Sequence, residues 1–298
     1  MPKCKFYKQI QYYSDDSGTT WTSTGLSRKG GLIEVGSADC GDVPPTIDGK
    51  CMLKYTNGST WYKPCDSSSA LTRTETKAYK PYSAMTQAVI GGCVTTIGNN
   101  VFSDCSGLTS VTIPNSVTII DYVAFYNCTS LTSVDIPNSV TTIGEGAFGG
   151  TSLASVTIPN SVTSIGVWAF SDCTSLTSVT IPSGLTSIGD GTFIGCESLQ
   201  SINIPNGITK IEVDAFYGCA SLSSITIPNN VTSIGNSAFE LCSGLTSITC
   251  LALTPPTLGT DVFNSTNDCT IYVPAASVSA YQSAWSTYAS RIEAIPNS

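Results

Sequence analysis

The chain has 298 residues, of which 41% are hydrophobic and 11% are charged. So much apolar material in a weakly charged chain predicts a folded core and excludes intrinsic disorder. The sequence contains no histidine, which removes the commonest general base, the commonest metal ligand and the usual pH switch.

Charge divides the chain into two regions. Residues 1–87 contain 11 Lys and Arg against 8 Asp and Glu, a net charge of +3, whereas residues 88–298 contain 2 against 13, a net charge of −11. The second region keeps Lys210 and Arg291 as its cations, so we expect no nucleic acid partner. No apolar run reaches the ~20 residues of a membrane helix, so no membrane span is expected.

The first region, residues 1–87, is predicted to be a small β-rich module. Residues 13–21 and 55–61 each carry a Tyr and a Trp on either side of a Ser-Gly or Asn-Gly turn, which is typical of a hairpin. The segment Met1–Ile10 carries lysines without an apolar stretch behind them, so no signal peptide is expected. The module cysteines form no Cys-x-x-Cys pair, which favours thiols over disulfides or a zinc site; they are Cys4, Cys40, Cys51 and Cys65.

A repeat of about 23 residues fills most of the second region. Ile-Pro pairs begin at residues 113, 136, 158, 181, 204 and 227, at steps of 22 or 23 residues. Phe and Leu recur with the same period, from Phe102 to Phe239 and from Leu108 to Leu245. A unit of this size cannot bury its own apolar edge, so the units are expected to stack as a solenoid with Phe and Leu ladders inside.

Each unit predicts one short parallel strand and one return. Residues 110–113, Ser-Val-Thr-Ile, alternate hydroxyl and apolar side chains, and this period of two is typical of a strand. Proline ends the strand. Val117, Ile120, Ala124 and Phe125 then recur at a spacing that fits an irregular or short helical return.

Six cysteines share one position of the repeat, three residues after the Phe. Because one falls inside each coil except that of Phe148, we expect buried thiols that pack as small apolar side chains, in preference to redox or metal chemistry. They are Cys105, Cys128, Cys173, Cys196, Cys219 and Cys242.

The array is expected to end in a C-terminal helical cap over residues 250–298, which leaves residues 88–249 as the solenoid. Residues 271–274 repeat the strand pattern. The apolar residues that follow are spaced three or four apart and predict one helix lying over the last coil; they are Val278, Tyr281, Trp285, Tyr288, Ile292 and Ile295.

The Leu-x-x-Val-x-Ile-Pro and Ala-Phe-x-x-Cys patterns resemble the unit of BspA-like leucine-rich-repeat proteins over about residues 88–298. Members with known roles are mostly surface adhesins of bacteria and some protists. The resemblance implies ligand binding without catalysis and names no ligand. Residues 1–87 resemble N-terminal pieces of gut bacterial proteins and their phages, which implies attachment of the array to a larger parent assembly.

Strand residues that point away from the core are the first candidates for a binding site. They would cover the concave face with hydroxyls, and Asp135 and Asn203 interrupt the threonine row, so specificity is expected there. A merely solvated β-face is the alternative. The candidates are Thr112, Asp135, Thr157, Thr180, Asn203 and Thr226.

Aromatic residues of the return are the second candidates. Tyr126 and Trp168, like Tyr122 and Tyr217, fall where the repeat pattern requires nothing large. Exposed aromatic rings can stack on sugars or anchor a protein interface. Ordinary packing between adjacent returns is the alternative.

We therefore expect a binding or adhesion protein and no enzyme, cofactor or metal site. Without histidine, and with one lysine in the array, no nucleophile and base can be paired. The expected partner of the acidic solenoid is a host or cell-surface protein or glycan. Because no export signal is seen, a phage fibre or virion decoration protein is favoured, and the alternatives are a secreted bacterial adhesin and a cytoplasmic interaction scaffold.

Overall fold

The computed structural model describes residues 82–296 continuously and, before them, the backbone of seven short strands between Lys3 and Leu71. Contacts divide the chain into two compact units, Met1–Thr46 and Ile47–Ser298. Among the described residues, no helix combines the length and the apolar character that crossing a membrane requires.

The first unit contains two antiparallel strand pairs. β1 (Lys3–Gln9) pairs with β4 (Leu32–Asp39), and β2 (Tyr13–Ser14) pairs with β3 (Trp21–Thr22). The second pair confirms the first predicted hairpin. The Tyr and Trp side chains expected to face each other across it lie outside the described residues.

The second unit begins before the first repeat. β5 (Lys50–Tyr55) pairs antiparallel with β6 (Thr60–Pro64), which confirms the second predicted hairpin. β5 also pairs antiparallel with β8 (Met85–Val89), and β8 pairs parallel with β10 (Ser110–Thr112). This division differs from the boundary predicted after residue 87, because the sheet continues across that point.

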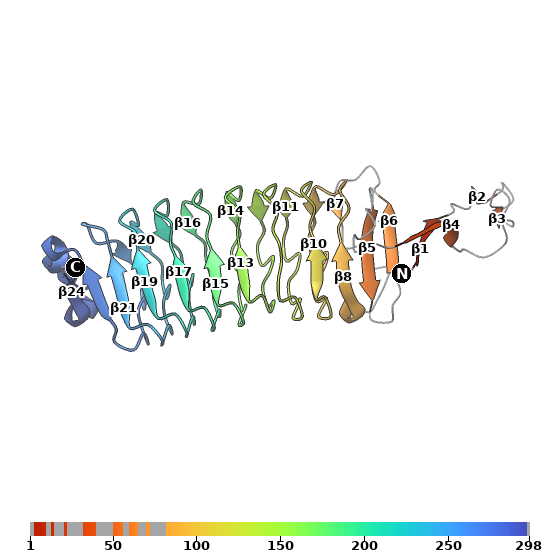
Figure 1. Cartoon of the computed structure of the whole chain (residues 1–298). Coiled ribbons are helices and arrows are strands. Elements are labelled where there is room, and N and C mark those ends of the chain that lie inside the picture. The colour runs from red at the N-terminus through yellow and green to blue at the C-terminus, as the bar shows by residue number, and fades with distance from the viewer. Residues whose placement is uncertain are drawn as a thin grey trace. The chain divides into compact units, whose positions relative to one another are not determined.

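The repeats form a solenoid with two rows of parallel strands (Figure 1). The predicted strand forms the row of longer strands, and every coil from the first to the last also has a two-residue strand in its return, which the sequence pattern did not predict. The longer strands after β10 are β13 (Ser155–Thr157), β15 (Ser178–Thr180), β17 (Ser201–Asn203), β19 (Ser224–Ile227), β21 (Ser247–Cys250) and β23 (Thr270–Val273).

The row of shorter strands begins at β7 (Ala70–Leu71), which pairs parallel with β9 (Thr96–Ile97). It continues through β11 (Ile119–Ile120), β12 (Thr142–Ile143), β14 (Ser164–Ile165), β16 (Ser187–Ile188), β18 (Lys210–Ile211), β20 (Ser233–Ile234) and β22 (Thr257–Leu258). The rest of each return is irregular, as predicted. Its backbone forms a third ladder, in which the Phe125 N–H donates to the Ala147 carbonyl at 2.8 Å.

A column of phenylalanine rings fills the core. From Phe102 to Phe263 each ring stacks on the next, with centroids 5.1 to 5.8 Å apart and interplanar angles of 6° to 18°. The leucine ladder from Leu108 to Leu245 is fully buried beside it. Both predicted ladders are therefore confirmed.

The six array cysteines are buried thiols, as predicted. From the second coil on, each Sγ donates to the carbonyl of the Phe in the preceding coil, as Cys128 does to Phe102 at 3.1 Å and Cys196 does to Phe170 at 3.2 Å. Thr151 occupies the cysteine position in the coil that lacks a cysteine, but its hydroxyl donates to the carbonyl of Phe148 in its own coil, at 2.8 Å. The thiols therefore act as small buried donors that satisfy backbone carbonyls.

Burial raises the pKa of Cys173 from its ordinary value of 9.0 to about 11, and burial raises the pKa of Cys242 to about 12. We expect a thiol reagent at neutral pH to label none of the six in the native protein and all six in denaturant without reductant. Mass spectrometry of the labelled peptides identifies the labelled cysteines, and disulfide-linked peptides among the six would contradict the labelling prediction.

The burial of these thiols also makes stability depend on pH. Because folding raises these pKa values, the free energy of unfolding should fall as the pH rises through 9 toward 11 and 12.

Cys93, in the first coil, is disulfide-bonded. The thiols expected at Cys4, Cys40, Cys51 and Cys65 lie outside the described residues.

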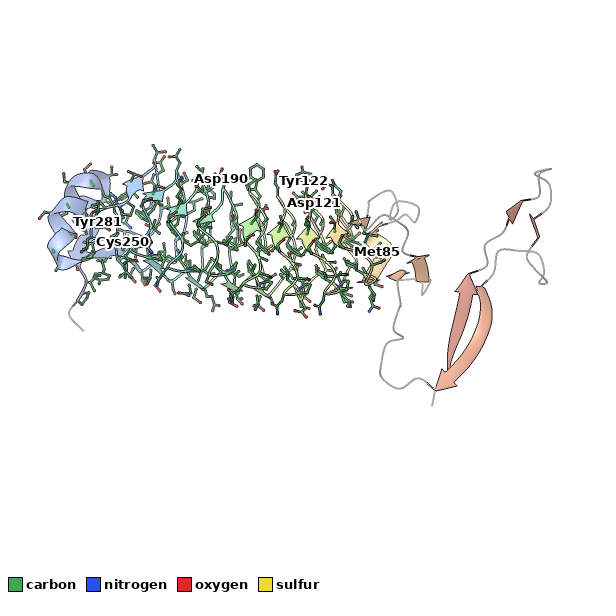
Figure 2. All side chains as sticks on the ribbon, turned by 90° about the horizontal axis from the view of Figure 1, so that it is seen from above. Met85, Asp121, Tyr122, Asp190, Cys250 and Tyr281 are labelled. Carbon is green, nitrogen blue, oxygen red and sulfur yellow. The ribbon has the colours of Figure 1, made fainter. Side chains whose placement is uncertain are left out.

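The C-terminal cap contains a shorter helix than predicted. α2 (Val278–Ala284) ends where Trp285 leaves the helical conformation, at φ −108° and ψ 49°, and the chain continues through a 3-10 segment into β24 (Ile292–Ala294). β24 pairs parallel with β23 and forms the end of the sheet. The apolar residues still cover the last coil. The Trp285 indole donates to the Pro256 carbonyl at 2.9 Å, and Tyr281, beside Cys250 in Figure 2, donates to the Ala252 carbonyl at 2.8 Å.

Candidate ligand-binding faces

The long-strand face is the outward side of the row of longer strands, from β10 to β21. All six residues predicted to bind ligand there are exposed. Their side chains make no hydrogen bond within the described part of the chain. Other threonines behave differently, since the Thr177 hydroxyl donates to the Ala154 carbonyl at 3.0 Å and the Thr209 hydroxyl donates to the Thr186 carbonyl at 3.0 Å. The hydroxyls of the long-strand face are therefore available to a ligand.

The row of longer strands is interrupted at the two positions predicted to be specific. The coil between β10 and β13 forms no strand at Ser133–Asp135, and β17, which ends at Asn203, does not pair with β19. Asp135 and Asn203 lie three coils apart. Asp135 therefore differs from the threonines in lying outside any strand, whereas Asn203 differs from them in its side chain and, like Thr112, Thr157 and Thr226, lies in a strand that pairs on one side only.

The turn face is the outward side of the irregular segments that follow the shorter strands, such as residues 121–127 and 166–172. It carries nine of the 13 acidic residues of residues 88–298: Asp104, Asp121, Glu145, Asp172, Asp190, Glu212, Asp214, Glu240 and Asp261. The positions of the long-strand face hold one, Asp135. The acidity expected of the whole solenoid surface is therefore concentrated on one side of it.

Several turn-face carboxylates are used within the fold. Asp190 accepts a hydrogen bond from the Val213 backbone N–H at 3.1 Å, Asp121 accepts one from the Tyr122 N–H at 2.8 Å, and Asp104 accepts one from the Asn127 amide at 3.3 Å. Partial burial raises the pKa of Asp214, and the nearby carboxylates of Glu240 and Asp190 raise it further. The crowding of like charges disfavours an anionic ligand on this face.

Large aromatic side chains lie exposed on the same turn face. Tyr122 is 42% exposed, Tyr126 is 37% exposed and Trp168 is 49% exposed. Figure 2 shows Tyr122 along the same edge of the coils as Asp190. Tyr217, the remaining aromatic candidate, is only partly exposed. The structure therefore separates the two predicted sets of site residues onto two different faces.

Possible metal ligands and reactive thiols are the remaining features of the described residues. Within the described ranges no three His, Cys, Asp or Glu side chains lie close enough to hold a metal ion. Burial raises the pKa values of Cys128, Cys196 and Cys219 well above the ordinary value, so these thiols stay protonated near neutral pH.

Stacked coils with a parallel strand in each repeat and internal Phe and Leu ladders define a leucine-rich-repeat protein. The chain belongs to the BspA-type leucine-rich-repeat family. The family profile, described as BspA type Leucine rich repeat region, matches in six copies over residues 72–182, 95–219 and 166–290. No curated protein sequence shows significant similarity to the chain.

The chain is similar to solved structures of bacterial leucine-rich-repeat proteins, and the first of these shares the fold. One from Bacteroides ovatus has a TM-score of 0.62 and 23% identity, and the match covers 89% of this chain and 70% of that one. A leucine rich cell surface protein from Faecalibacterium prausnitzii has a TM-score of 0.41 and 32% identity, over 56% of this chain and 60% of that one. A Treponema pallidum leucine rich repeat protein has a TM-score of 0.40 and 29% identity, over 54% and 72%.

The sequence pattern did not predict that the carboxylates gather on the turn face. When the units are aligned, Glu145 and Asp190 fall at the same position of the repeat as Tyr122, so the alignment shows that carboxylates and an aromatic share one position. The alignment does not show in which direction the side chains at that position point, because the return has no simple periodicity.

Proposed function

We propose that the protein is a non-enzymatic binding protein of the cell surface, whose long-strand face binds an extended protein or glycan. The observation that carries this proposal is the unused hydrogen-bonding capacity of the Ser and Thr side chains on that face. Hydroxyls both donate and accept, and parallel strands repeat them about every 4.8 Å. An extended ligand can then make similar contacts with several coils, oriented by Asp135 and Asn203.

Two features support a surface location. BspA-like proteins with known roles are mostly surface adhesins, and the chain is a member of this family. The disulfide at Cys93 is typical of proteins that reach an oxidising environment. A phage fibre remains the second candidate, and detection of the chain on intact cells, in cytosol or in purified phage particles decides between the locations.

Attachment to a parent assembly, predicted for residues 1–87, is proposed for residues 1–46. Residues 50–55 and 85–89 contribute strands to the solenoid sheet, so they belong to the binding unit. Residues 1–46 contain five Lys and Arg against five Asp and Glu, a net charge of zero, which makes them distinct from the acidic repeats.

The double variant Asp135→Thr and Asn203→Thr tests the long-strand face. We expect it to weaken binding to a glycan array or to intact host cells by roughly tenfold or more, because it restores the uniform threonine row. The unfolding free energy should change by less than about 0.5 kcal/mol, because both residues are exposed and threonine suits a strand.

Glu197→Thr is the matched control, because it also removes an exposed carboxylate but lies outside both faces. It should bind as the wild type does. Equal binding by the double variant and the wild type would remove the long-strand face from the proposal. A wild-type chain that binds neither glycans nor cells would remove the proposed function itself.

A further inference from the structure

We infer that the turn face holds a second binding site, at Tyr126 and Trp168, which binds a neutral glycan by stacking sugar rings on the two aromatic side chains. The inference rests on the proposed binding function and adds to it a separate site and a ligand class. Its basis is the way in which glycines of the adjacent coils support the two rings.

Each ring lies against a glycine of the next coil. A Cβ added at Gly149 would lie 3.0 Å from Cδ2 and 3.2 Å from Cε2 of Tyr126. A Cβ added at Gly191 would clash with Cδ1 and Nε1 of Trp168. Backbone therefore supports one side of each ring, while Tyr126 is 37% exposed and Trp168 is 49% exposed. A ring held in this way loses little conformational freedom when a ligand covers its other side.

Trp168 occupies a backbone conformation that does not suit it. Its φ is 55°, in the left-handed region, and the same repeat position in the flanking coils is glycine, Gly146 with φ 57° and Gly191 with φ 52°. Other coils also hold a residue with a side chain at this position, and those residues are Asn100, Val123, Asp214, Ser237 and Asp261. Trp168 is the largest side chain of this set, and the backbone conformation requires no large side chain here.

The polar atoms around the rings are free to recognise hydroxyls. The Trp168 indole N–H and the Tyr126 hydroxyl make no hydrogen bond within the described chain, and neither do the carboxylates of Glu145 and Asp172. Glu145 precedes Gly146 in the coil between the two aromatics, and Asp172 follows Trp168 in its own coil. Sugars are commonly held by a ring face together with carboxylates that accept from their hydroxyl groups.

Charge selects the ligand class. Within the described residues, no Lys or Arg lies on the turn face. A glycan that carries uronic acid or sulfate groups would therefore meet only repulsion there. A basic polypeptide is the competing partner, because the carboxylates keep their charge, and polylysine tests it. The support of the two exposed rings favours a neutral glycan, because lysine side chains have no flat face to stack on them.

The spacing suits a chain of sugars that runs along the solenoid. Tyr126 and Trp168 are two coils apart, and successive Phe rings over these coils are separated by 5.3 and 5.5 Å. A pyranose unit in a glycan chain has a length similar to one coil, so along the solenoid the two aromatics would lie about two sugar units apart. Gly146, between them, offers no side chain that would obstruct the chain.

The test uses variants that place at each site a residue already present at the same position in a neighbouring coil. Tyr126→Ser follows Ser103, and Trp168→Gly follows Gly191, so both should fold. The full chain is titrated with neutral cello-, manno- and xylo-oligosaccharides, an oligogalacturonate and polylysine. We expect a neutral oligosaccharide to bind and each variant to weaken this binding by roughly tenfold.

Two controls make the result specific. Leu241→Gly removes a side chain of similar exposure, 41%, from the turn face far from the two aromatics, and it should leave binding unchanged. Trp168→Phe keeps an aromatic ring, so it should retain most of the affinity and abolish the change in tryptophan emission caused by the ligand.

The inference is overturned if no neutral oligosaccharide binds, if both substitutions leave binding unchanged, or if only polylysine binds and the substitutions abolish it. Its failure is distinguishable from that of the proposed function. Loss of cell or glycan binding in Asp135→Thr and Asn203→Thr alone would support the long-strand face and remove the aromatic site. The opposite pattern would support the aromatic site alone.

Discussion

Phe193→Ala is expected to lower the free energy of unfolding by about 3 to 5 kcal/mol. Phe193 is 1% exposed and stacks between Phe170, at 5.8 Å, and Phe216, at 5.6 Å. Removing the ring leaves a cavity between coils, and the neighbouring rings cannot close it because the backbone ladders on both sides hold the coils apart. Denaturant unfolding followed by circular dichroism measures the change.

Phe193→Leu is the conservative comparison and should be destabilised less than the alanine variant, since it refills part of the volume. A repeat array can unfold in parts, so a second transition in the alanine variant would locate the weakened coil. A loss below about 1 kcal/mol would show that the ring column contributes far less than its burial indicates.

The second large effect is expected on the stability of N-terminally truncated fragments, and it depends on the residue at which the fragment begins. A fragment of residues 47–298 should fold with nearly the stability of the full chain, whereas a fragment of residues 88–298 should lose at least about 3 kcal/mol. The shorter fragment lacks Leu71 and Met85, which are 2% and 0% exposed, and it lacks the strand partners β5 and β7. A solenoid without its end cap exposes the core of its first coil to water.

Hydrogen exchange measures this difference coil by coil. The shorter fragment should lose protection first at Ile97 and Phe102, while the coils around Phe216 stay protected. The longer fragment should keep ligand binding and lose attachment to the parent assembly if residues 1–46 serve that role. Equal stability of the two fragments would place the start of the folding unit at the repeat, as the sequence pattern alone predicted.

The sequence by itself determined the repeat and everything that depends on its period. Phe, Leu and Cys recur at fixed positions, and a coil that cannot bury its own edge must stack on the next, so the buried ladders follow from the spacing. The alternation in Ser110–Ile113 likewise predicts which side chains of the strand face outward, because neighbouring side chains of a strand point to opposite faces.

Only the tertiary structure decided what depends on contacts without a local pattern. Residues 50–89 join the solenoid through pairing between β5 and β8, and no local signal states which strand a hairpin will pair with. The C-terminal helix ends at Ala284 although its apolar spacing continues, because β24 is hydrogen-bonded to β23 instead. The carboxylates and the aromatics share the turn face because the irregular return directs them there, and the support of Trp168 by Gly191 joins two coils whose contact arises only when the solenoid is stacked.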